Sequence, residues 1–363
     1  SGAIDWGDGT IVENTYANRT HTYVNSGDYD VTVLGECVGF GFFNSGDKDK
    51  IINLKNWGNG FRFINNTNGY FRGCTNLDIT ATDTPTLDNI NTFVLAFRGC
   101  PNLIWNETIN DWDVSSIIKF DYMFDSGTNQ FSQSLNGWTF SQPNTSLQNM
   151  FASNTGFNGD IGDWDLTNVK NIQKLFNGAS SFNQNINNWD VTGLTSLNSV
   201  FSGASSFNQP LNNWDVSNIS NIGGIFLGAS SFNQDINNWD ISKVTSLSNV
   251  FSGTSSFNKP LNNWNTSKVT DFNSIFSGAN SFNQDISSWD FSAVTITNSL
   301  NILMQSNYNP IYYDNLLIKW AKDTSEGGLP LGIIANINMR NVKYTPNGAA
   351  ARQSILDNNK AVT

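Results

Sequence analysis

The sequence has little charge and few of the residues that usually carry catalysis or bind metals. Charged residues make up 13% of the 363 positions, and His21 is the only histidine. Any Ser–His–Asp or Cys–His mechanism would therefore have to use His21. The three cysteines, Cys37, Cys74 and Cys100, form no CxxC pair, so the spacing typical of a zinc site is missing. We therefore expect a protein that is not an enzyme and has no metal-binding motif.

Basic residues are also scarce. Lysine and arginine number 19 against 30 acidic residues, which gives a net charge of -11. Proteins that bind nucleic acid usually present a basic face, so we expect no nucleic-acid partner. No run of 18 apolar residues occurs, so we expect no membrane span. By charge alone, neutral sugars and divalent cations are the favoured ligands.

The most regular feature of the sequence is a tryptophan that returns every 25 or 26 residues. The tryptophan column is Trp112, Trp138, Trp164, Trp189, Trp214, Trp239, Trp264 and Trp289. Such a period indicates one supersecondary unit that is copied along the chain and stacked on its neighbours. An asparagine column has the same period: Asn158, Asn183, Asn208, Asn233, Asn258 and Asn283. We expect these amides to hydrogen-bond from one coil to the next.

Each unit has three parts, which residues 186–206 illustrate. Residues 186–191 have the L-x-x-L-x-L spacing of a leucine-rich-repeat strand, which places Asn188 and Asp190 on the solvent side. Residues 194–201 carry apolar side chains at i, i+3 and i+7, which predicts a helical turn capped by the preceding Ser or Thr. The small polar residues that end the unit predict a bend into the next coil.

The copies share the motif Ser-Ser-Phe-Asn-Gln-x-Ile/Leu-Asn-Asn-Trp-Asp-Val-Ser, followed by Val-Thr-x-Leu-x-x-x-Phe-x-Gly-Ala. This motif resembles the BspA-like leucine-rich repeats of bacterial surface proteins. The resemblance implies an α/β repeat solenoid that is leucine-rich-repeat-like and right-handed, with short parallel strands, helical turns and terminal caps. It also implies an extracellular protein at the bacterial cell surface with a role in adhesion. Similar repeats occur in phage tail proteins, so a virion protein is the alternative.

The two ends of the chain depart from the repeat. Residues 5–10 (Asp-Trp-Gly-Asp-Gly-Thr) and the alternating residues 29–33 resemble the later half of a PKD-type immunoglobulin-like domain, with a tight hairpin turn at Asp8-Gly9. This segment is either the remnant of a separate sandwich or a β-cap on the first coil. Near the other end, residues 312–322 have an amphipathic pattern that predicts a helix.

We expect residues 301–363 to cover the last apolar face of the array, because solenoids need caps. Besides the first helix, a last strand over 333–342 and a last helix over 347–356 are predicted. The chain therefore divides into three expected parts: a β-rich PKD-like cap at 1–50, a solenoid at 51–300 and an α/β cap at 301–363.

One aspartate column has the strongest functional pattern: Asp113, Asp165, Asp190, Asp215, Asp240 and Asp290. It is either a soluble face with local Asp–Ser hydrogen bonds, a row of calcium bridges, or a ligand strip for a repetitive glycan. Calcium prefers six or more oxygen ligands, and one carboxylate per coil supplies few of them. The residues expected to bind a glycan or protein on a host or neighbouring cell are Asn188, Asp190, Asn213, Asp215, Asn238 and Asp240. A phage receptor-binding component and a structural spacer are the alternative functions.

Cys74 and Cys100 stand in a column that holds Ala179 and Ala204 in later coils. One coil apart, their Cα atoms should lie about 5 Å from each other, which is within the range of a disulfide. The pair is therefore either a disulfide or two stacked reduced thiols.

Overall fold

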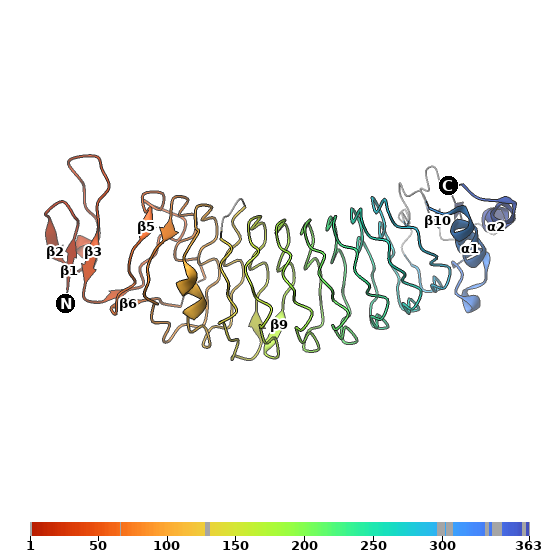
Figure 1. Ribbon diagram of the computed structural model, residues 1–363, viewed down its shortest axis with the longest axis horizontal. Helices are drawn as coiled ribbons and strands as arrows, with labels where there is room; N and C mark the ends of the chain where they lie inside the picture. The colour runs from red at the N-terminus through yellow and green to blue at the C-terminus, as the bar shows by residue number, and fades with distance from the viewer. Residues whose placement is uncertain are drawn as a thin grey trace.

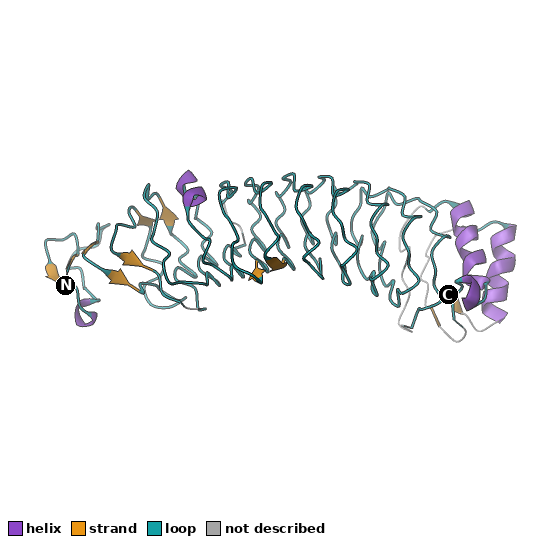
Figure 2. Ribbon diagram, turned by 90° about the horizontal axis from the view of Figure 1, so that it is seen from below, coloured by secondary structure: helices purple, strands orange, loops and turns teal. Residues whose placement is uncertain are grey.

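The structure is a computed structural model in which the chain forms one long stack of coils (Figure 1). A small sheet lies at the N-terminal end of the stack, and a pair of helices lies at the C-terminal end (Figure 2). The structure describes residues 2–65, 67–127, 131–295, 302, 308–330, 334–335, 343–357 and 361–362.

The N-terminal segment is a three-stranded antiparallel sheet in the order β2-β1-β3. Its elements are β1 (Ala3–Asp5), β2 (Ile11–Glu13), the 3-10 helix η1 (Tyr16–Asn18) and β3 (Thr32–Leu34). The predicted hairpin at Asp8-Gly9 is confirmed, because Asp5 pairs with Ile11 across it. His21 has a structural partner here, since its Nε2 lies 2.7 Å from Asp8 Oδ2.

Parallel pairing between coils begins directly after this sheet. The paired strands are β4 (Cys37–Val38) with β6 (Phe61–Arg62), β5 (Asn53–Leu54) with β7 (Asp78–Ile79), and β8 (Thr145–Ser146) with β9 (Val169–Asn171). A 3-10 helix, η2 (Glu107–Asp111), lies between them in the chain. In later coils the pairing is reduced to single bridges such as Ser196 with Asn221.

The strand predicted over residues 186–191 is wrong, because the parallel bridges use a later segment of each coil. Trp189 N donates to Ile186 O at 3.1 Å, so this backbone closes a turn on itself, and residues 186–191, all of which the structure describes, form no backbone–backbone hydrogen bond with a neighbouring coil. The predicted alternation of side chains is nevertheless confirmed: Trp189 and Val191 are buried while Asn188 and Asp190 are exposed.

The helical turn predicted over residues 194–201 is also wrong. Ser199 has φ +54°, a left-handed conformation that interrupts a right-handed helix. Alternate N–H groups instead point to the next coil: Leu197 N donates to Asn221 O at 2.8 Å and Ser199 N donates to Gly223 O at 3.0 Å. The apolar i, i+3, i+7 spacing therefore marks an inward-facing series of tight turns.

Columns of aromatic side chains fill the interior of the stack. The rings of Trp189 and Trp214 lie 6.4 Å apart at an angle of 8°, and those of Phe182 and Phe207 lie 5.8 Å apart. Each indole from Trp138 to Trp289 also donates its N–H to a buried backbone carbonyl of the preceding coil, as Trp214 does to Ile186 O at 3.0 Å. The aromatic core and the backbone of successive coils are thus held together by the same residues.

The predicted asparagine ladder is confirmed. Asn208 N donates to Asn183 Oδ1 at 2.9 Å, and Asn233 N donates to Asn208 Oδ1 at 2.9 Å. The same bond repeats in each coil from Asn183 to Asn283. These amides fix the position of one coil on the next at the edge of the core.

Cys74 and Cys100 are both free and buried. Of the two alternatives, the structure therefore has the stacked reduced thiols. Cys100 Sγ donates to Phe71 O at 3.0 Å, and Thr254 uses the same column position to donate to Phe226 O at 2.7 Å. Burial raises the pKa of the Cys74 thiol to about 12.

Two packed helices end the stack (Figure 2). The elements are α1 (Pro310–Ala321), the 3-10 helix η3 (Thr324–Glu326), β10 (Ile334–Ala335), α2 (Pro346–Asp357) and β11 (Ala361–Val362). Both predicted helices are confirmed, and Leu316, Leu317 and Trp320 of α1 are fully buried. The predicted strand over 333–342 lies outside the described residues except for β10, which pairs with β11.

Candidate binding surface

The aspartate column is held in place by hydrogen bonds within each coil. Asp190 Oδ1 accepts the N–H of Thr192 at 2.9 Å and its hydroxyl at 2.6 Å. The same bond to the N–H two residues on is made by Asp113, Asp165, Asp215, Asp240 and Asp290. Asn265 makes it too, to Ser267 N at 3.2 Å, so the turn does not require a charge. The local Asp–Ser hydrogen bonds that the sequence allowed are therefore present.

These hydrogen bonds lower the pKa of several carboxyl groups below the ordinary value. The hydroxyl two residues on is the main cause at Asp113 and Asp165. The backbone N–H two residues on is the main cause at Asp215 and Asp240. Asp190, Asp215 and Asp240 are exposed, so these carboxyl groups of the column are in contact with solvent.

The lowered pKa values predict that acid weakens the stack. A carboxyl group whose pKa is lower in the folded state adds stability above its unfolded pKa of about 3.9, and this is lost as pH falls through the folded value. We expect the melting temperature to decline below about pH 4. The decline should be smaller in the variant D113N/D165N/D215N/D240N, which keeps the turn as Asn265 does. Thermal unfolding followed by circular dichroism from pH 6 to pH 2.5 measures this, and parallel pH profiles would contradict it.

No cluster of three or more His, Cys, Asp or Glu side chains suited to a metal ion occurs in the part of the chain that the structure describes. Each carboxylate of the aspartate column bonds within its own coil and, at Asp215 and Asp240, meets a lysine, Lys243, at longer range.

Next to the aspartate column runs a row of paired asparagines, which we call the asparagine face. It consists of Asn187, Asn188, Asn212, Asn213, Asn237, Asn238, Asn262 and Asn263. Asn187 Oδ1 accepts the N–H of Asn213 at 3.0 Å, and Asn237 Oδ1 accepts that of Asn263 at 3.0 Å two coils later. Bonds between coils therefore fix the spacing of the exposed amides.

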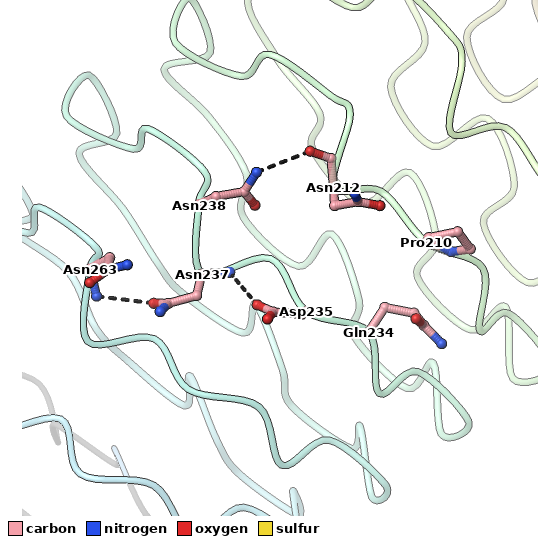
Figure 3. Close-up of a pocket in the computed structure, with 7 residues that line it drawn as sticks. All are labelled: Pro210, Asn212, Gln234, Asp235, Asn237, Asn238 and Asn263. Carbon is pink, nitrogen blue, oxygen red and sulfur yellow. Dashed lines mark hydrogen bonds between the residues drawn. The ribbon is translucent and has the colours of Figure 1, made fainter.

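The asparagine face is hollowed at its centre, where a groove of about 430 Å³ is lined by Pro210, Asn212, Gln234, Asp235, Asn237, Asn238 and Asn263 (Figure 3). Asn238 Nδ2 donates across the groove to Asn212 O at 3.0 Å. Asp235 Oδ1 accepts the N–H of Asn237 at 2.9 Å. Pro210 stands where other coils have Asn185 or Asp235, so its coil lacks that polar side chain beside the groove.

The structure places all six predicted site residues on the exposed surface, and of these only Asn238 lines the groove. Asn188 and Asn213 lie in the same row in the preceding coils. The prediction missed the other six residues that line the groove: Pro210, Asn212, Gln234, Asp235, Asn237 and Asn263. The alternation of Asn185, Pro210 and Asp235 in one column was the available signal, because a proline there removes a polar side chain from every second coil.

The sequence matches one known protein family over most of the coils. The family described as "Mycoplasma protein of unknown function, DUF285" matches three successive segments, residues 65–146, 145–246 and 231–303. The chain belongs to this family. The three DUF285 matches show a repeat protein, and they cover the coils that carry the aspartate column and the asparagine face. No curated protein matches the sequence.

The DUF285 matches leave out the N-terminal sheet and helices α1 and α2. Among the described residues of this DUF285 protein, no helix has the length and apolar character needed to cross a membrane.

Proposed function

We propose that this DUF285 protein is a non-enzymatic binding module outside the cell, whose asparagine face recognises a neutral glycan on a host or neighbouring cell. The observation that supports this most is the regular row of exposed amides, with a groove at Asn212, Asp235 and Asn238. The resemblance to BspA-like surface proteins supports the location and the adhesive role. We also propose that the stacked coils form a right-handed solenoid of the leucine-rich-repeat type.

Amide side chains suit a neutral, hydroxyl-rich ligand. Each amide offers donors and an acceptor, which match sugar hydroxyl groups without requiring a charge. Hydrogen bonds between coils hold Asn187, Asn212 and Asn237 in place, as when Asn237 Nδ2 donates to Asn262 Oδ1 at 3.1 Å. Side chains that are already ordered lose less entropy on binding. The adjacent carboxylates make an anionic glycan the less favourable ligand.

A repetitive surface also suits a repetitive ligand. The coils from Ile186 to Asn263 present one chemical pattern at nearly constant spacing, so a polymer can engage several amide pairs at once. Such multivalency raises overall affinity without any new type of contact. We therefore expect oligosaccharides to bind more tightly than the single sugars of which they consist.

Removal of the amides is expected to reduce glycan binding. The variant N188A/N213A/N238A should lower affinity for bound glycans by about tenfold or more, which corresponds to about 1.4 kcal/mol. A glycan array identifies ligands of the wild-type protein, and calorimetry or interferometry with the best of them measures the change.

The matched control is D190N/D215N/D240N, which keeps the turns, as Asn265 shows, and removes three charges from the same face. Affinity for a neutral glycan should change little in this variant. Full retention of binding by the alanine variant would remove the asparagine face as the site. If only D190N/D215N/D240N loses much of its affinity for the glycan, the carboxylates and not the amides recognise the ligand.

A structural spacer is the second candidate function. It is favoured by the aspartate column, because Asp190 and its equivalents are engaged in turns of their own coil. A spacer needs no ligand, so it predicts that wild-type protein binds nothing on the array.

A further inference from the structure

One coil of the array departs from its neighbours at three positions on the same surface. Residues 222–229 read Ile-Gly-Gly-Ile-Phe-Leu-Gly-Ala, where the coil before has Leu-Asn-Ser-Val-Phe-Ser-Gly-Ala and the coil after has Leu-Ser-Asn-Val-Phe-Ser-Gly-Thr. Gly223 and Gly224 thus replace an amide and a hydroxyl side chain. Leu227 replaces a serine. The buried Ile222, Ile225 and Phe226 stay apolar, like their equivalents in the neighbouring coils, so polar side chains are lost only at the three changed positions.

The missing side chains leave a hollow of about 500 Å³ in the surface. It is lined by Asn198, Ser199, Ser220, Asn221, Gly223, Gly224, Leu227, Thr245, Ser246, Ser248 and Asn249. A Cβ atom on Gly223 would lie 3.3 Å from Asn198 Nδ2, and one on Gly224 would lie 3.3 Å from Ser199 Oγ. Side chains like those of neighbouring coils would therefore occupy this space.

The hollow combines neutral polar groups with one apolar surface. None of its lining residues is ionisable, and Leu227 is 37% exposed beside them. Asn221 Oδ1 accepts the N–H of Gly223 at 3.0 Å, which leaves its Nδ2 as a donor. Asn249 Nδ2 donates to Ser248 Oγ at 3.0 Å, which leaves its Oδ1 as an acceptor.

We propose that this hollow is a binding site for a single neutral hexopyranose unit of a glycan. The apolar C–H face of the sugar ring would rest on Leu227, and its hydroxyl groups would bond to the amides of Asn221 and Asn249. The volume lies in the range of small-molecule sites, and their usual design is an apolar surface with a few placed polar groups. That the ligand is a sugar rests on the proposed function, whereas the location of the site in the hollow rests on the structure alone.

The hollow lies on a different arc of each coil from the asparagine face. The two share no lining residue, and the buried Trp214 and Ile219 stand between Asn213 and Ser220 in the chain. The asparagine face repeats in four successive coils, whereas the hollow occurs where Gly223 and Gly224 stand together. It would therefore bind one defined sugar unit, while the asparagine face binds along a polymer.

The test is to fill the hollow with the residues of the preceding coil. In the variant G223N/G224S the added side chains match Asn198 and Ser199, and Ser199 already has φ +54° against +61° at Gly224, so the fold should be kept. Leu227 remains as a reporter in protein with labelled leucine methyl groups. We would titrate methyl glycosides of glucose, galactose, mannose and N-acetylglucosamine. At least one should shift the Leu227 methyl signals saturably in the wild type, and the filled variant should weaken this by about tenfold or more.

Two results would overturn the site: Leu227 signals that no glycoside moves in the wild type, or shifts that persist undiminished in G223N/G224S. The variant N188A/N213A/N238A separates this inference from the proposed function. If that variant loses glycan-array binding and no glycoside moves the Leu227 signals, the hollow is not a sugar site and the asparagine face remains the proposed binding surface. If the Leu227 signals respond and array binding is unchanged in that variant, the hollow is supported and the asparagine face is not the binding surface. Absence of both signals in the wild type removes both proposals.

Discussion

Replacement of Trp214 by alanine is expected to lower the free energy of unfolding by about 3–5 kcal/mol, the usual cost of removing a large buried aromatic side chain. Trp214 is 3% exposed, and its ring stacks on Trp189 and Trp239 at 6.4 Å on either side. Its loss therefore opens a cavity between three coils. Urea unfolding followed by circular dichroism measures the effect.

The indole N–H of Trp214 makes a separate contribution. It donates to Ile186 O at 3.0 Å inside the core, so the variant W214F should lose this hydrogen bond and leave the carbonyl with the N–H of Trp189 as its remaining partner. A typical hydrogen bond inside a protein contributes about 0.5–1.5 kcal/mol net, and this is the expected cost of losing the indole N–H. Trp112 supplies a matched control, because it is 2% exposed and its Nε1 has no hydrogen-bond partner in the described structure.

The variant W112F removes a similar apolar volume but no hydrogen bond. W214F should therefore destabilise the protein more than W112F does. Equal effects of the two would mean that the row of indole hydrogen bonds contributes nothing net. A W214A variant with an unfolding free energy within about 0.5 kcal/mol of the wild type, the usual range of a surface substitution, would contradict the cavity argument.

The side-chain columns could be predicted from the sequence because each column repeats the same contact between equivalent residues of successive coils. Trp189 over Trp214 and Asn183 over Asn208 require only that equivalent residues lie next to each other in successive coils, and a constant period ensures this. The same reasoning predicted the solvent side of the chain correctly at Asn188 and Asp190. Periodicity therefore predicts which residues meet and which face they occupy.

The backbone path could not be predicted in the same way. The left-handed position in the turn region is held by Lys174, Ser199, Gly224 and Asn249 in successive coils, so no residue type marks it. Without that conformation, apolar residues at i, i+3 and i+7 have the pattern of a helix. The strand was misplaced for a similar reason, because alternating burial also occurs in an extended segment whose N–H groups bond locally.

The sequence predicted which residues of the candidate site are exposed, but it did not predict where the surface has grooves. The six predicted residues are all exposed, but a groove depends on which neighbouring side chain is short or absent. Pro210 beside Asp235 and Gly223 beside Asn198 are both departures from the repeat. In a repeat protein the common residues determine the framework, so the exceptions to the pattern are the positions to examine for binding.

The second large effect is expected at Gly203, in a turn that lies against Gly178 of the preceding coil. Gly203 has φ +72°, and a Cβ atom there would lie 3.2 Å from the Cα of Gly178 and 3.3 Å from its N. The left-handed conformation costs a non-glycine residue about 1–2 kcal/mol, and the forced separation of two backbones adds about 1–3 kcal/mol. G203A should therefore lower the free energy of unfolding by about 2–5 kcal/mol, measured in urea.

Gly58 separates the two causes, because it has φ +67° but no atom within 4 Å of a built Cβ. G58A should show only the conformational cost, about 1–2 kcal/mol. The difference between the two variants then measures the contact between Gly203 and Gly178. Gly228, Gly253 and Gly278 continue the same column, each with a Cβ position 3.3–3.8 Å from the backbone of the glycine before it. If G203A and G58A are equally stable, the spacing of the coils is set by the aromatic columns and not by this row of glycines.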